Sequence, residues 1–294
     1  MALLTAVFSY NRGQLLLNCV MSILHFSPNT DIVVFDDGSD DPYTLEVLTQ
    51  LEARGCDVVV NERDPLAIRG SLYPNLNAAL ELSRERRFGL LHLVQDDMQF
   101  VWRSPTLEDD VESLFETQLN AGQIYIHFWR RLSRLPTTVC EDIPGYLQPA
   151  LGPVGIVSVK RLTERGFTFP SSEPETGVRG RELQLEAYSV ANPVVARVPW
   201  PMYARYGAMS GRAKVTEKPF LLKPLDAQTI HRLVHRPLHE RPYGDSFYVP
   251  WGWRCWNPYL YANSHKSWIK AMVQVAIHDR SLSGLLPRRV GDMS

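Results

Sequence analysis

The sequence lacks the features that mark membrane proteins, disulfide-rich secreted proteins and nucleic-acid-binding proteins. Its 294 residues include four cysteines without a Cys-x-x-Cys pair, which argues against a zinc site or disulfide framework and favours a cytoplasmic protein. No apolar run reaches the ~18 residues of a membrane span, and residues 1–8 are too short and uncharged for a signal peptide. A formal net charge of −1 offers no electrostatic basis for binding nucleic acid.

The chain also lacks internal repeats and low-complexity tracts, and its 45% hydrophobic content is ordinary for a globular protein. Over the first hundred residues, short β-rich runs alternate with segments of helical periodicity. The expected strands are residues 3–8, 32–35, 56–60 and 90–94, and the expected helices are residues 15–24, 42–54 and 76–87. Because such alternation forms a mainly parallel sheet with helices on both faces, we expect an α/β fold.

The pattern is less regular beyond residue 98. We expect helices at 107–119 and 182–191, strands at 123–128, 152–159 and 194–198, a loop at 138–149, and a final amphipathic helix at 263–279. These elements predict a core at residues 1–200 and a loop-rich extension at residues 201–294.

Two of the expected strands end in paired carboxylates. The strand at 32–35 is followed by Asp36 and Asp37, and the strand at 90–94 by Gln95, Asp96 and Asp97. Parallel strands bring their carboxyl ends to one edge of the sheet, where α/β proteins bind ligands. Carboxylates there can accept hydrogen bonds from a nucleotide or hold Mg²⁺ or Mn²⁺. The alternative for Asp37 is a helix cap before a glycine turn.

These motifs resemble family-two glycosyltransferases of the GT-A fold. The resemblance covers residues 1–100, which it implies are the nucleotide-binding half of the core. It is carried by Ser9-Tyr10-Asn11-Arg12, Asp36-Asp37-Gly38-Ser39 and Gln95-Asp96-Asp97. It implies that Asp37 contacts the base or ribose of a nucleotide sugar. It also implies that Asp97 binds the metal and that Asp96 lies near the sugar or ribose. The other residues that it implies at the donor site are Ser9, Tyr10, Asn11, Arg12, Asp36, Asn77 and Gln95.

Two positions depart from the family pattern. Gln95 replaces the first carboxylate of the family's Asp-x-Asp motif, so metal binding is expected to depend on Asp97. Leu76 replaces the arginine that precedes the family's asparagine, and nearby Arg69 is expected to supply that charge.

The second half resembles the family more loosely, in a glycine segment at 152–155 and a Gly-Phe pair at 166–167. In the family, an acidic helix start then carries the catalytic base. Glu182, at the start of an expected helix, is the first candidate here, with Glu173 and Glu175 as alternatives. The other interpretation of Glu182 is a carboxylate that only stabilises the first turn of a helix.

The resemblance implies an inverting, metal-assisted transfer of a hexosyl or N-acetylhexosaminyl group from a nucleotide sugar, with UDP as the expected nucleotide. The acceptor would be a hydroxyl of a saccharide or glycan, as in polysaccharide biosynthesis. A nucleotidyltransferase is one alternative, although residues 9–13 are not a glycine- and lysine-rich phosphate loop. The other is a non-catalytic nucleotide-sugar-binding protein, which Gln95 and the absent Glu-Asp pair favour. The basic end of the expected terminal helix has two interpretations. One is contact with an anionic membrane, and the other is a helix docked on the protein with its basic end in solvent.

Overall fold

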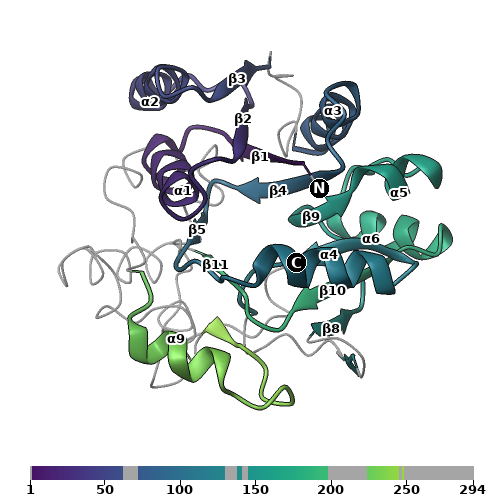
Figure 1. The fold of residues 1–294 in the computed structure, drawn as a ribbon. Helices are drawn as coiled ribbons and strands as arrows, with labels where there is room; N and C mark the ends of the chain where they lie inside the picture. Colours follow the sequence, from purple (N-terminus) through teal and green to yellow (C-terminus); the bar gives the residue numbers. More distant parts are fainter. Residues whose placement is uncertain are drawn as a thin grey trace, which may run out of the picture.

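The computed structural model describes residues 2–61, 72–129, 138–140, 145–197, 224–244 and 247. Its main sheet contains β1 (Leu3–Ser9), β2 (Asp31–Asp36), β3 (Asp57–Val60), β4 (Leu90–Gln95), β6 (Ala121–Tyr125), β7 (Thr138–Val139), β8 (Gly145–Gln148), β9 (Gly155–Ser158) and β10 (Glu186–Val190). These nine strands lie in the order β3-β2-β1-β4-β9-β6-β10-β8-β7 (Figure 1). Among them, all but β8 and β9 run in one direction. The expected α/β class with a mainly parallel sheet is confirmed.

Helices cover both faces of this sheet. The helices in the described residues are α1 (Gly13–Phe26), α2 (Pro42–Glu52), α3 (Leu72–Glu85), α4 (Leu107–Thr117), α5 (Val159–Glu164), α6 (Glu173–Glu182) and α9 (Ala227–Val234), which follows the last strand in the sequence. Buried side chains of α1, α2 and α4 share one apolar cluster, and those of α3 and α5 share another. Figure 1 shows α1 and α3 on opposite sides of the first strands. Burial on both faces explains the continuous apolar runs of the central strands.

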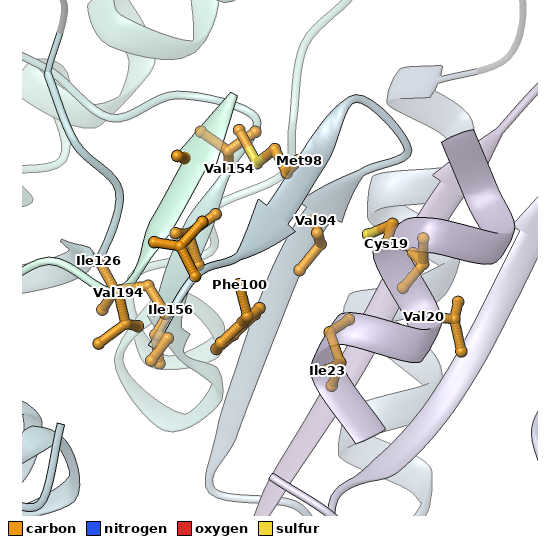
Figure 2. Close-up of a cluster of buried hydrophobic side chains, with 14 of the residues drawn as sticks. Cys19, Val20, Ile23, Val94, Met98, Phe100, Ile126, Val154, Ile156 and Val194 are labelled. Carbon is orange, nitrogen blue, oxygen red and sulfur yellow. The ribbon is translucent and has the colours of Figure 1, made fainter. Parts of the chain in front are cut away.

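A second, two-stranded sheet continues from the main one. It pairs β5 (Met98–Phe100), which directly follows β4, with β11 (Val195–Arg197) in antiparallel register. Figure 2 shows Met98 and Phe100 of β5 in the same apolar cluster as Cys19 and Ile23 of α1. This buried packing fixes β5 against α1, and with it the turn that carries Asp96 and Asp97.

Two expectations for the second half are wrong. Residues 182–191 are not a helix, because α6 ends at Glu182, Gln184 takes a positive φ of 55° and β10 follows. Residues 138–149 are not a loop, since β8 pairs with β10 and buries Tyr146 completely. Both strands form by pairing with distant segments, which local periodicity does not reveal.

Several expectations lie outside the described residues. Arg69, the terminal helix at 263–279 and most of the extension from residue 201 onward belong to this group. Within the described ranges, Cys19 and Cys56 are buried and Cys140 is half-buried. None of the helices in those ranges combines the length and apolar character that crossing a membrane requires.

Candidate functional site

The two carboxylate pairs lie at one edge of the main sheet, because β2 and β4 flank β1 on either side. The backbone N–H of Asp37 donates to the carbonyl of Ser9 at 3.0 Å, and that of Asp96 donates to the carbonyl of Phe8 at 3.1 Å. Hydrogen bonding between β1 and each neighbour therefore extends one residue past the ends of β2 and β4. Strands in a sheet are about 4.8 Å apart, so the ends of β2 and β4 are separated by about 10 Å.

Asp96 is held by the β1–α1 turn. The guanidinium of Arg12 donates to one carboxylate oxygen at 3.1 Å, and the Ser9 hydroxyl donates to the other at 3.1 Å. Burial raises the pKa of Asp96 to about 6, against the opposing effect of Arg12 and with a smaller contribution from Asp97. Burial alone would lower the pKa of Arg12, but the charges of Asp96 and Asp97 outweigh it and raise that pKa.

Asp97 faces a second arginine. Its carboxylate lies 3.9 Å from the guanidinium of Arg197, the last residue of β11. The side chain of Asp97 is 13% exposed and that of Arg197 is 27% exposed. Arg197 reaches this position because it pairs with Met98, the residue after Asp97. No local pattern in the sequence indicates Arg197 as a site residue, since only the pairing of β5 with β11 brings it there.

Asp36 organises the turn after β2. It is fully buried, and its carboxylate accepts hydrogen bonds from the backbone N–H and the hydroxyl of Ser39 at 2.7 and 2.6 Å. Burial raises the pKa of Asp36, and the bonds from Ser39 partly offset that effect. Gly38, with a φ of +68°, permits the tight turn between them. This turn leaves Asp37, which is 6% exposed, at the end of β2.

Asn11 joins the turns after β1 and β2. Its side-chain oxygen accepts hydrogen bonds from the backbone N–H groups of Asp40 and Asp41 at 2.9 and 3.0 Å. The backbone N–H of Asn11 donates to the Ser39 hydroxyl at 2.8 Å. Asp41 in turn caps α2 by accepting from the N–H of Thr44 at 2.8 Å. The helix-cap role considered for Asp37 therefore belongs to Asp41.

The remaining donor-site candidates lie in different surroundings. Tyr10 is half-buried in the β1–α1 turn, and Gln95 is the half-buried last residue of β4. Asn77 lies on α3, where its side-chain amide exchanges two hydrogen bonds with the backbone of Phe169, at 2.9 and 2.8 Å. The amide of Asn77 thus connects α3 to the segment before α6.

Glu182 and Glu173 stand at opposite ends of α6, a helix about 15 Å long. Glu182 is the last helical residue, pairs with Arg179 at 3.3 Å and precedes β10 by four positions. Because β10 runs in the same direction as β4, its first residue lies at the sheet edge opposite Asp96 and Asp97. Glu173 begins the helix, after the capping residue Ser172.

The start of α6 lies near the edge that carries Asp96 and Asp97. Gly155 pairs with Leu93 near the end of β4, so residues 152–154 are at that edge. A Cβ on Gly152 would lie 2.9 Å from the Tyr125 hydroxyl and 3.8 Å from a carboxylate oxygen of Glu173. Tyr125 ends β6 and donates to the carbonyl of Ala150 at 2.9 Å.

The sequence carries local signals for this helix start. Ser172 is a preferred capping residue, Pro174 favours the first turn, and Glu175 stands three positions after the cap. Together they predict a helix beginning at Glu173.

The donor atoms at the site fit a divalent cation that arrives with a phosphate ligand. In the ranges that the structure describes, no group of three or more His, Cys, Asp or Glu side chains gathers as a self-sufficient metal site. Mg²⁺ is usually held by one or two carboxylates together with substrate phosphates and water. Both carboxylate oxygens of Asp96 already accept hydrogen bonds, from Arg12 and from Ser9. Of the two neighbouring carboxylates, Asp97 is therefore the better candidate for the cation.

Comparison with solved structures finds chains of similar fold at low sequence identity. S. aureus TarS shares 14% identity over 97% of this chain and 50% of that chain, with a TM-score of 0.48, so this chain spans half its length. TarS 1–349 in complex with UDP-GlcNAc shares 14% identity over 100% of this chain and 84% of that chain, with a TM-score of 0.48. The mannosyltransferase PcManGT from Pyrobaculum calidifontis, in complex with GDP-Man and Mn²⁺, shares 16% over 96% and 77%, with a TM-score of 0.49.

The sequence matches a protein-family model over part of its length, whereas a search of curated proteins finds no match. Residues 6–86 match the model described as Glycosyl transferase family 2. The match extends from β1 through α3, includes Asp36 and Asp37, and ends before Asp96 and Asp97. The resemblance expected from the sequence is therefore confirmed over this segment, and residues 6–86 carry the sequence pattern of glycosyl transferase family 2.

Proposed function

We propose that this protein is a glycosyltransferase that moves a sugar from a nucleotide sugar, with UDP as the expected nucleotide, to a hydroxyl of a saccharide or glycan acceptor. The observation that supports this best is that β2 and β4 flank β1 and end at the same edge of the sheet. Their separation of about 10 Å suits a ligand with a nucleoside at one end and a sugar diphosphate at the other. The family match over residues 6–86 supports the same activity.

The proposed division of labour follows from the contacts at this edge. Asp37 accepts hydrogen bonds from the base or ribose, while Asp36 and Ser39 hold its turn in shape. Arg12 and Ser9 orient Asp96 toward the sugar end of the donor. Asp97 holds the divalent cation, Mn²⁺ or Mg²⁺, which when bound with the donor supplies Lewis-acid stabilisation of the departing diphosphate.

Glu173, in place of Glu182, is the proposed general base. Its carboxylate lies beside Gly152 at the edge that carries Asp96 and Asp97, whereas Glu182 is at the far end of α6. An acceptor hydroxyl must lose its proton as it attacks the anomeric carbon, and a positioned carboxylate typically contributes ~10²–10⁴-fold to the rate. Attack on the face opposite the leaving diphosphate gives inversion in a single displacement, without a protein nucleophile.

A panel of nucleotide sugars with Mn²⁺ and saccharide acceptors tests the activity. Release of nucleoside diphosphate is followed in the wild type, Glu173→Gln, Glu175→Gln and Glu182→Gln. We expect Glu173→Gln to lower kcat by ~10²–10⁴-fold while the other two variants retain it. A loss confined to Glu182→Gln would instead assign the base to the other end of α6.

A second pair of variants tests the role of Asp97. Asp97→Ala is compared with Glu116→Ala, an exposed carboxylate on α4 that serves as the control. Activity unaffected by Asp97→Ala would remove Asp97 from the mechanism. Saturable binding of nucleotide sugars by the wild type, without turnover toward any acceptor, would favour a binding protein over an enzyme.

A further inference from the structure

We propose that Arg197 is a phosphate-binding residue of the donor site, and that it rests on Asp97 until a nucleoside diphosphate group and its cation arrive. This inference rests on the proposed function, because it names the part of the donor that Arg197 would recognise. The structure contributes the observation that Arg197 and Asp97 face each other at 3.9 Å.

The position of Arg197 does not depend on its ion pair. β11 pairs with β5 over three residues, and the last pair places Arg197 opposite Met98, next to Asp97. Met98 is itself buried in the apolar cluster beneath the site (Figure 2). Backbone pairing would therefore keep Arg197 at this edge of the site even if its contact with Asp97 opened.

The two arginines at this edge are held differently. Arg12 donates a hydrogen bond at 3.1 Å to Asp96, a carboxylate with a side chain only 4% exposed. The contact of Arg197 with Asp97, at 3.9 Å, is longer than a hydrogen bond, and the side chain of Asp97 is more exposed than that of Asp96. Arg12 is thus a fixed counter-ion for Asp96, whereas the guanidinium of Arg197 can exchange partners at low cost.

Charge explains why the exchange would favour donor binding. A cation bound at Asp97 would take over the role of counter-ion there, and would leave the guanidinium of Arg197 available to the phosphate groups of the donor. A planar guanidinium can donate two parallel hydrogen bonds to phosphate oxygens. Because the diphosphate gains negative charge when the sugar departs, a guanidinium in this position also stabilises the transition state.

Calorimetric titration with UDP, GDP and uridine in the presence of Mn²⁺ tests the phosphate contact. The variants are Arg197→Gln, Arg197→Lys and, as control, Arg84→Gln, an exposed arginine paired with Glu81 on α3. We expect Arg197→Gln to weaken binding of the preferred diphosphate about 10- to 100-fold, the cost of losing hydrogen bonds between charged groups, with uridine affinity unchanged. Arg197→Lys should be intermediate, and Arg84→Gln should match the wild type.

Binding of Mn²⁺ alone, measured from the paramagnetic resonance of the unbound ion, provides a second readout. Removing the arginine that competes for Asp97 should tighten Mn²⁺ binding by up to about fivefold in Arg197→Gln. The two effects have opposite signs, whereas general damage to the site would weaken both ligands. Unchanged UDP and GDP affinities in Arg197→Gln, beside a wild type that binds one of them, would overturn this inference alone. A wild type that binds neither nucleotide would overturn the proposed function as well.

Discussion

Arg12 donates a hydrogen bond to Asp96 at 3.1 Å, although 84 positions separate the two residues in the sequence. The bond joins the turn after β1 to the turn after β4. The Ser9 hydroxyl makes a second connection by donating to the other oxygen of Asp96. An arginine and an almost fully buried carboxylate therefore fix the relative positions of two strand ends at the candidate site.

Arg12→Gln should destabilise the protein by about 3 kcal/mol, because it leaves a buried carboxylate without its counter-ion. Urea unfolding of Arg12→Gln, Asp96→Asn and the double variant measures the effect. Since burial raises the pKa of Asp96 to about 6, protonation at pH 5 should make the loss in Arg12→Gln smaller than at pH 8.

The double variant Arg12→Gln/Asp96→Asn serves as the control for this pair. It should be more stable than the sum of the two single losses predicts, because neither charge is left alone. Strictly additive losses would show that Arg12 and Asp96 do not stabilise each other.

Gly152→Ala should cost about 1–3 kcal/mol, because the new Cβ would lie 2.9 Å from the Tyr125 hydroxyl in a packed region. Tyr125→Phe removes that oxygen, so the alanine should be tolerated better in the Tyr125→Phe background. Thermal or urea unfolding of the four proteins gives the coupling. An equal cost of Gly152→Ala in both backgrounds would mean that the hydroxyl is not what excludes a side chain at Gly152.

Asn11 should show two separable effects, one from its side chain and one from its backbone. Asn11→Gly keeps the positive φ of 49° accessible but loses the bonds to the N–H groups of Asp40 and Asp41, for a loss of about 1–2 kcal/mol. Asn11→Ala should cost about 1 kcal/mol more, because alanine disfavours that conformation. Urea unfolding measures both, and a variant pair of equal stability would contradict the backbone part.

His92 should make the protein sensitive to acid. It is buried in β4 against the ring of Phe100, and burial lowers its pKa from 6.5 to about 3. Between these values the unfolded chain binds more protons than the folded protein, so this contribution to stability is lost as the pH falls from about 6.5 toward 3. The raised pKa of Asp96 acts in the opposite direction, so the effect of His92 has to be isolated by substitution.

His92→Leu isolates that contribution. The difference in unfolding free energy between the wild type and His92→Leu should change by about 2 kcal/mol between pH 7.5 and pH 5, in favour of the variant at the lower pH. Urea unfolding at the two pH values measures it. A difference that stays constant with pH would show that His92 does not titrate with a lowered pKa.

Local pattern was sufficient for the first half of the chain. The apolar runs and their turn residues predicted β1, β2 and β4 with ends close to those observed. The direction of parallel strands then predicted that Asp37 and Asp97 would share one sheet edge. Such predictions succeed where burial on both faces of a strand is written into a continuous run of side chains.

Local pattern failed where a strand depends on a distant partner. Local pattern predicts a helix where β10 forms and a loop where β8 forms. It fails there because each strand acquires its hydrogen bonds from the other and from β6 or β7. The predicted helix therefore starts at Glu182, although Ser172 and Pro174 indicate the earlier start at Glu173 that the structure has. The position of α6 is what makes Glu173 the better candidate for the base.

The order of residues along this chain by itself determined the alternation of strands and helices, the acidic turns at two strand ends and the family pattern of residues 6–86. Only the tertiary structure decided that Arg12 holds Asp96, that Arg197 faces Asp97 and that Glu173 lies beside Gly152 at the start of α6, with Glu182 at its other end. The physical reason is that turns and apolar runs are properties of neighbouring residues. The partner of a charge depends on which strands pair, and pairing depends on segments far apart in the sequence.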